Sequence, residues 1–113
     1  MKATDLTSGK ELAREVAVAE TFLSRLKGLL GKKELPPGEA LWIKPCSSVH
    51  SFGMKFPIDV VFLDRDMRVV AVARELKPGR VSAPRSRARS VLELPAGAID
   101  SATTDIGNRI EIA

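Results

Sequence analysis

The sequence predicts a mainly β fold, either a β-sandwich or a partly open barrel of about seven short strands, with one short α-helix near residues 21–30. Two observations support this prediction. Short alternating or continuous apolar runs recur along the 113 residues and are separated by glycine- and proline-containing turns. Only one stretch shows the spacing of an amphipathic helix. The length suits a single domain over residues 1–113.

The first twenty residues divide into a lead-in and a strand. Residues 1–10 show no periodicity, and we expect them to be loose. From Glu11 to Glu20, the apolar residues Leu12, Val16 and Val18 share one parity, which predicts a strand.

The predicted helix follows this strand. Its apolar residues fall on one helical stripe, namely Phe22, Leu23, Leu26, Leu29 and Leu30. Thr21 suits the N-cap because its hydroxyl can accept from free amides of the first turn. Gly31 suits the C-terminal end.

Five further segments are predicted to be strands. Ile58–Leu63 is apolar on both faces apart from Asp59, so it should be central and form a hairpin with the segment after it. We expect residues 76–89 to form a long loop and residues 98–106 to contain a helical turn. The five strand segments are Glu39–Lys44, Ile58–Leu63, Arg68–Glu75, Ser90–Leu94 and Arg109–Ile112.

Charge and cysteine content bound the functional class. The net charge is +4, but residues 74–89 carry six basic residues and one acid, which leaves −1 for the rest of the chain. The basic character is therefore one local patch. The lone Cys46 excludes an internal disulfide, and no apolar run is long enough to cross a bilayer. We expect a soluble, cytoplasmic protein, monomeric and without a membrane partner.

Four segments match a known family pattern. They are Glu20-Thr21 with the run ending Lys27-Gly28-Leu29-Leu30, Phe52 to Asp64, Val91-Leu92-Glu93-Leu94-Pro95-Ala96-Gly97, and Gly107-Asn108-Arg109-Ile110. The chain resembles the uncharacterised bacterial and archaeal family called domain of unknown function 192. The resemblance implies a compact β-rich fold with a short helix, and it implies no reaction. Many members have a tryptophan where this chain has Gly53, and many have cysteines where residues 76–89 carry arginines.

The stretch from Pro45 to Asp64 is the predicted functional centre. It contains the only cysteine, the only histidine and three of the four phenylalanines. We expect a pocket here that binds a small ligand or a protein partner without catalysis. Its predicted lining residues are Cys46, His50, Phe52, Met54, Lys55 and Asp59. Asp59 is the most informative of them, since a carboxylate inside an apolar strand needs a partner, supplied either by the fold or by a ligand.

Two other functions stay open. Cys46 and His50 could act as nucleophile and base of an enzyme, because a neighbouring histidine lowers a thiol pKa. A metal site at Cys46, His50 and Met54 would need a helix, which the surrounding proline, serines and glycine disfavour, so we expect neither metal nor cofactor. The third hypothesis is phosphate or nucleic-acid binding.

That third hypothesis depends on the basic patch alone. Arg85, Arg87 and Arg89 alternate with small residues and would point one way if the chain were extended there. A solvated loop is the simpler explanation, and nucleic-acid binding ranks last of the three functions. The predicted anion-binding residues are Lys77, Arg80, Arg85, Arg87 and Arg89.

Overall fold

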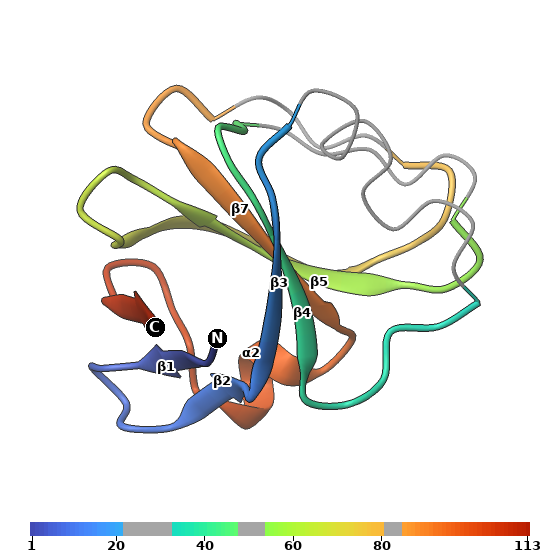
Figure 1. Cartoon of the computed structure of the whole chain (residues 1–113), viewed down its shortest axis with the longest axis horizontal. Helices are drawn as coiled ribbons and strands as arrows, with labels where there is room; N and C mark the ends of the chain where they lie inside the picture. Colours follow the sequence, from blue (N-terminus) through green and yellow to red (C-terminus); the bar gives the residue numbers. More distant parts are fainter. Residues whose placement is uncertain (22–32, 48–53, 81–84) are drawn as a thin grey trace.

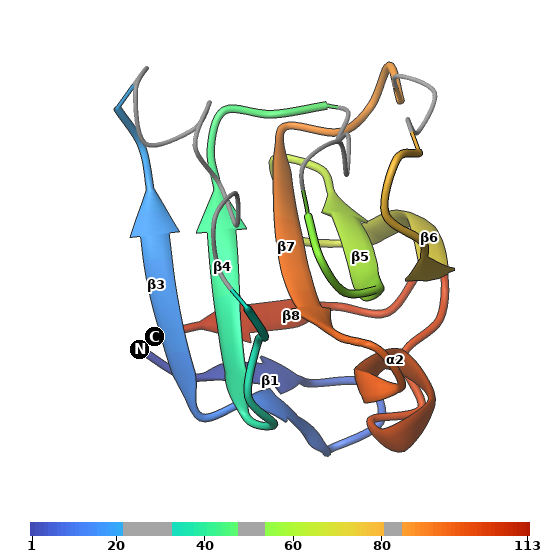
Figure 2. The ribbon, with the colours of Figure 1, turned by 90° about the vertical axis from the view of Figure 1, so that its right-hand side faces the viewer.

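The computed structural model describes residues 1–21, 33–47, 54–80 and 85–113 (Figure 1). The predicted helix near residues 21–30 falls almost wholly outside these ranges. Within them, eight strands form two open sheets of three and five strands, so the mainly β prediction is confirmed (Figure 2).

The small sheet joins the two ends of the chain. Its strand order is β2-β1-β8, and both pairings are antiparallel. The strands are β1 (Ala3–Asp5), β2 (Glu11–Ala13) and β8 (Ile110–Ile112). The expectation of a loose lead-in over residues 1–10 was therefore wrong. A three-residue strand is too short to show a period of two, and it is held by pairing with β8, more than 100 residues away in the sequence.

The large sheet has the order β3-β4-β7-β5-β6. Strands β3 and β4 are parallel, and the other neighbours are antiparallel. The strands are β3 (Glu15–Ala19), β4 (Glu39–Ile43), β5 (Ile58–Leu63), β6 (Val69–Leu76) and β7 (Ser90–Pro95).

The predicted strands agree with those observed, with one division. The run predicted over Glu11–Glu20 breaks at Arg14 into β2 and β3, which belong to different sheets. Strand β5 is buried along its whole length and pairs with β6 as the expected hairpin. Its neighbours β6 and β7 cover both of its edges, and its side chains are buried on both faces.

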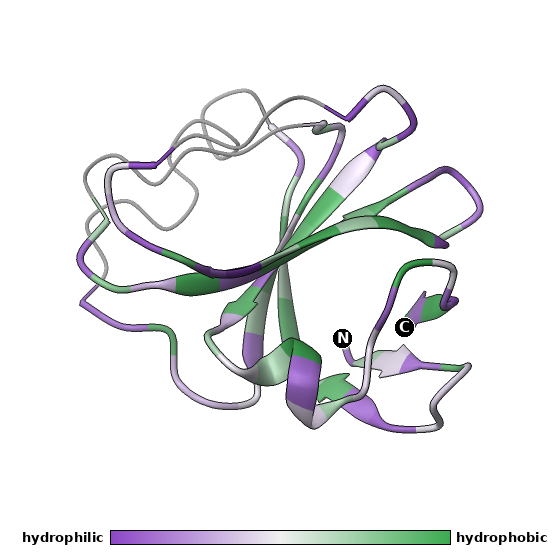
Figure 3. Ribbon diagram, turned by 180° about the vertical axis from the view of Figure 1, so that it is seen from behind, coloured by the Kyte–Doolittle hydropathy of each residue, from purple (hydrophilic) through white to green (hydrophobic). Residues whose placement is uncertain are grey.

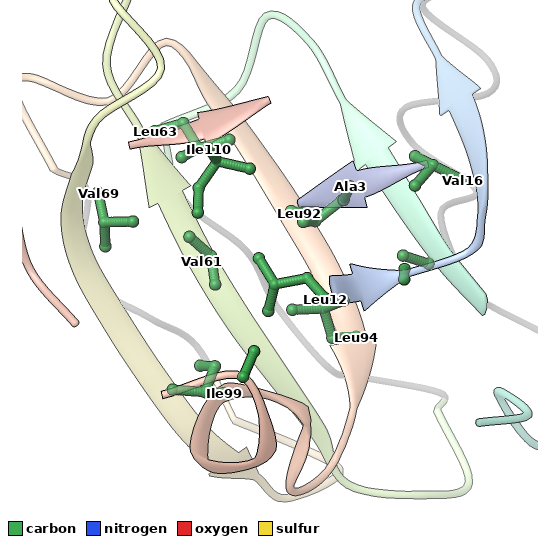
Figure 4. Packing of buried hydrophobic residues seen from close by; sticks show 13 residues of the cluster. Ala3, Leu12, Val16, Val61, Leu63, Val69, Leu92, Leu94, Ile99 and Ile110 are labelled. Carbon is green, nitrogen blue, oxygen red and sulfur yellow. The ribbon is translucent and has the colours of Figure 1, made fainter. Parts of the chain in front are cut away.

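The main hydrophobic core lies between the two sheets (Figure 4). Val61, Leu63, Leu92 and Leu94 of the large sheet face residues of the small sheet and its flanking segments. Those facing residues include Ala3, Leu12, Ile99 and Ile110. Figure 3 shows the hydrophobic colouring concentrated along the central strands and the hydrophilic colouring in many of the connections.

A second hydrophobic cluster covers the opposite face of the large sheet. It is formed by Met54, Ile58, Val60, Phe62, Ala71, Ala88 and Val91. Successive strand residues point to opposite faces, so β5 supplies Val61 and Leu63 to the main core and Val60 and Phe62 to the second cluster. The large sheet is therefore buried on both sides at its centre.

The helix α2 (Ala98–Ser101) provides the helical turn expected within residues 98–106. Gly97 precedes it with φ of 95°, a left-handed conformation that favours glycine. Ile99 points from α2 into the main core and is fully buried. In the described part of the chain, no helix is long and apolar enough to cross a membrane.

Candidate functional site

Asp59 links three elements of the fold. Its Oδ1 accepts a hydrogen bond from the amide of Glu75 at 2.9 Å. Its Oδ2 accepts from the amides of Gly97 at 3.1 Å and Ile99 at 3.0 Å. The residue is 1% exposed. The carboxylate therefore connects β5 to the end of β6 and to the first turn of α2, on the main-core side of the large sheet.

The other residues of the predicted pocket lie elsewhere. Met54 is buried in the second cluster, and the half-buried Cys46 packs against that cluster. The amide of Cys46 donates to the carbonyl of Arg89 at 2.9 Å, while Lys55 is exposed. His50 and Phe52 lie outside the described residues. The structure thus brings Cys46 and Met54 together and places Asp59 on the opposite face of the sheet.

The described residues contain no group of three His, Cys, Asp or Glu side chains that could hold a metal ion. The Cys46–His50 pairing, on which both the metal and the enzyme hypotheses depend, lies partly outside the described residues.

The arginine row forms a turn and not an extended segment. The amide of Ala88 donates to the carbonyl of Arg85 at 3.0 Å, and the Ala88 side chain is buried. The Nη1 of Arg89 donates back to the carbonyls of Ser86 and Ala88. The guanidinium of Arg85 lies 5.9 Å from the ring centre of Phe62. The three arginines are exposed, as are Lys77 and Arg80, but they do not form the regular row expected for an extended chain.

Glu93 and Trp42 are the described residues that each have a buried side-chain polar atom without a hydrogen-bond partner, and of the two only Glu93 is ionisable. Glu93 occupies the middle of β7, with Leu41 of β4 opposite on one side and Val60 of β5 on the other. Its side chain is 4% exposed, and no group in the described structure donates a hydrogen bond to its Oε1. Burial raises the pKa of Glu93 to about 7. Leu41, Val60, Phe62, Val91 and Glu93 lie on one side of the large sheet, which we call the Glu93 face.

Sequence reasoning did not select Glu93. An acid between Leu92 and Leu94 looks like the solvent side of a half-exposed strand, because alternation usually places polar residues outward. Only the order of the strands shows that both faces of β7 are covered. One signal was present, since Glu93 belongs to the Leu-Glu-Leu-Pro-Ala-Gly segment that carries the family resemblance.

An open groove of about 400 Å³ lies beside the Glu93 face. The groove and the Glu93 face share Leu41. This residue pairs across the strands with Ala17 of the groove on one side and with Glu93 on the other. The groove is lined by Glu15, Val16, Ala17, Leu35, Glu39, Ala40 and Leu41. Its volume is in the range of small-molecule sites in proteins, which run from about 300 to 1,000 Å³.

The chemistry of Glu93 follows from its surroundings. A buried carboxyl oxygen without a hydrogen-bond donor needs either a proton or a donor from a bound molecule. With a pKa of about 7, Glu93 is present in both protonation states at neutral pH. The protonated form donates one hydrogen bond, whereas the ionised form accepts only. The site is therefore suited to recognising a polar group on an otherwise apolar molecule.

Comparison with known proteins gives the family of the chain. Residues 4–112 match the family DUF192, described as uncharacterized ACR. The UPF0127 protein PH1112 of Pyrococcus horikoshii is 39% identical over 102 residues, which cover 86% of each chain. The UPF0127 protein PF1050 of Pyrococcus furiosus is 34% identical over 112 residues, covering 95% of this chain and 94% of the relative.

Two crystal structures share the fold. A protein of unknown function from Novosphingobium aromaticivorans superimposes with a TM-score of 0.84 and 24% identity, covering 98% of this chain and 82% of its own. A proposed transcription regulator from Sinorhizobium meliloti superimposes with a TM-score of 0.83 and 19% identity, covering 97% of this chain and 89% of its own. The resemblance inferred from the motifs is confirmed by the match over residues 4–112, and the chain belongs to the DUF192 family.

Proposed function

We propose that this protein is a non-catalytic binding domain whose small-molecule ligand sits on the Glu93 face of the large sheet. The observation that carries the proposal is the buried Oε1 of Glu93, to which no described residue donates. Leaving a buried polar group unpaired costs about 1–3 kcal/mol of folding free energy. A ligand that supplies the donor removes this cost when it binds, so the cost itself favours the bound state.

The surroundings of Glu93 define the shape of such a ligand. Val60 and Val91 are fully buried in the second cluster, and Leu41 lies at the groove. Leu41 offers apolar contact at the groove, and it is the cross-strand neighbour of Glu93. A few polar groups set in an apolar lining are the usual composition of small-molecule sites. Met54 and Cys46, predicted as pocket residues, pack on this same cluster.

Methyl NMR provides the test, because strand alternation supplies an internal control. The protein is labelled at Leu and Val methyl groups and titrated with three probes of equal length, namely 1-hexanol, n-hexylamine and hexanoate. We expect at least one probe to shift the methyl signals of Leu41, Val60 and Val91. The signals of Val61, Leu92 and Leu94 face the main core and should move little.

Three results would contradict the proposal. The first is an absence of saturable shifts with all three probes. The second is a set of shifts centred on the main-core methyl groups, which would place the binding site between the sheets. An exchange-averaged shift spread evenly over both faces would indicate non-specific partitioning and would also count against it.

Anion binding is the second candidate function. Its support is the exposure of all five basic residues predicted for it, namely Lys77, Arg80, Arg85, Arg87 and Arg89. Binding of inorganic phosphate or of a mixed-sequence oligonucleotide is measured at low salt and again at about 0.2 M salt. Electrostatic binding should weaken steeply with salt. Absence of binding at low salt would remove this candidate.

A further inference from the structure

We infer that the ligand of the Glu93 face carries a protonated amine, which pairs with the Glu93 carboxylate while the apolar part of the ligand lies toward Leu41 and the groove. This inference rests on the proposed function, since it names the chemical class of the ligand for that site. Two independent observations support it, one at Glu93 itself and one in the groove.

The first observation is the missing counter-charge. Glu93 has apolar cross-strand neighbours on both sides, and no described residue donates to its Oε1. A neutral donor satisfies one lone pair of the carboxyl group. An ammonium group satisfies it and also neutralises the ionised form, and hydrogen bonds between charged groups are about twice as strong as neutral ones. A cation is therefore the better complement to a buried carboxylate.

The second observation is the charge of the groove that leads to Leu41. Glu15 and Glu39 are paired in register on β3 and β4, and both line the groove. The described lining includes these two acids and no basic residue. Arg14 is next to Glu15 in sequence, but its guanidinium packs on Gly38 and forms no ion pair with an acid of the described chain. The two acids outnumber this one cation, so the potential along the groove favours a cation over an anion.

Arg85 is a described cation on this side of the sheet, but it is placed differently. Arg85 stacks over Phe62, which pairs with Val91 and lies toward the opposite end of β7 from Pro95. It donates no hydrogen bond to the buried Oε1 of Glu93. Arg85 therefore does not supply the missing partner of Glu93. Its position is compatible with a ligand that enters from the side of Leu41.

The test compares n-hexylamine with 1-hexanol, which has the same chain length and a neutral head group. Dissociation constants are taken from the methyl shifts of Leu41 and Val60 at pH 7.5. We expect n-hexylamine to bind wild-type protein about tenfold more tightly than 1-hexanol. In Glu93→Gln, which keeps the shape and removes the charge, the amine preference should fall to the part that the groove acids supply, about twofold to fivefold.

Two further variants separate the contributions of site and groove. Glu15→Gln combined with Glu39→Gln should weaken n-hexylamine binding by about twofold to fivefold and reduce its dependence on salt, with 1-hexanol unchanged. Glu111→Gln removes an exposed acid from β8 of the small sheet and should change neither probe.

The outcomes distinguish this inference from the proposed function. Equal binding of both probes to wild-type protein, or an amine preference that is undiminished in Glu93→Gln, would overturn the amine assignment and leave small-molecule binding standing. Tighter binding of hexanoate than of n-hexylamine would overturn it as well. If none of the three probes binds, the proposed function and this inference both fail.

Discussion

Asp59 of β5 holds the backbone of Ile99 in α2 through a 3.0 Å hydrogen bond from the Ile99 amide to Oδ2. Ile99 is fully buried in the main core, so this bond ties a short surface helix to the centre of the large sheet. Together with the bonds from Glu75 and Gly97, it uses both oxygens of Asp59 within the fold.

Replacing Asp59 by asparagine should destabilise the protein. The side-chain amide has one acceptor oxygen, so at least one of the three buried or part-buried backbone amides loses its partner. We expect the free energy of unfolding to fall by about 2–4 kcal/mol, measured by urea denaturation. Asp100→Asn is the matched control, because its ion pair with Arg74 is exposed and should contribute less than about 1 kcal/mol.

A stable Asp59→Asn variant would contradict this structural role. If that variant also failed to bind the probes that wild-type protein binds, Asp59 would belong to the ligand site after all. A destabilised variant that still binds would separate Asp59 from the site.

Glu93→Gln should become more stable relative to wild-type protein as the pH rises. Burial raises the pKa of Glu93 from 4.5 to about 7, so the folded state binds the proton more tightly than the unfolded state. The free energy of unfolding of wild-type protein therefore falls as the pH rises from 4.5 to about 7, and this contribution of Glu93 stays lost above pH 7. We expect the difference between the two proteins to grow by about 3 kcal/mol from pH 4 to pH 8.

Denaturation curves at several pH values measure this difference. Glu111→Gln serves as the exposed control and should follow the wild-type curve. A difference between Glu93→Gln and wild-type protein that does not change with pH would show that Glu93 has no raised pKa in solution and is already paired.

Asp5→Asn should destabilise the protein at neutral pH and remove part of its sensitivity to acid. Burial raises the pKa of Asp5, but hydrogen bonds from Asn108, Ser8, Thr104 and Thr7 outweigh this and hold the pKa below 3.8. The stability that Asp5 contributes is present above pH 3.8 and is lost as the pH falls through the lower pKa of the folded state. We expect a loss of about 2–3 kcal/mol at pH 7.

The free energy of unfolding, measured by urea denaturation below pH 3.8, provides the check. Wild-type protein should lose stability more steeply than Asp5→Asn below pH 3.8, and the two curves should approach each other there. Parallel curves would mean that the Asp5 pKa is the same in the folded and unfolded states.

Alkylation of Cys46 distinguishes the binding proposal from the enzyme alternative. The thiol belongs to a half-buried residue packed against the second cluster, so we expect iodoacetamide to react more slowly with folded than with urea-unfolded protein. His50→Ala should leave the rate unchanged. A fast reaction at neutral pH, with an apparent thiol pKa well below the usual value of about 8.5 and slowed by this substitution, would favour the enzyme.

Local sequence patterns predicted the strands that have a clear period. The run Ile58–Leu63 is continuous and apolar, and it forms the buried strand β5. Residues 98–101 form the expected helical turn. The short strand β1 was missed, because three residues cannot show a period and its pairing with β8 spans nearly the whole sequence.

The candidate site was predicted only in part. Cys46 and Met54 were selected by residue type and do share one cluster. Asp59 was grouped with them by proximity in sequence, but strand alternation turns its side chain to the other face of β5. Glu93 was left out, since alternation alone does not show whether the second face of a strand meets solvent or protein.

The sequence by itself determined the fold class, the family, most strand positions and the local nature of the basic patch, because these depend on short-range periodicity, motifs and residue counts. Only the tertiary structure decided that β7 is central, that Asp59 binds three backbone amides, and that Glu93 is buried without a described donor. The reason is physical: burial and hydrogen-bond partners are set by which strands become neighbours, and β4, β5 and β7 meet across long stretches of chain.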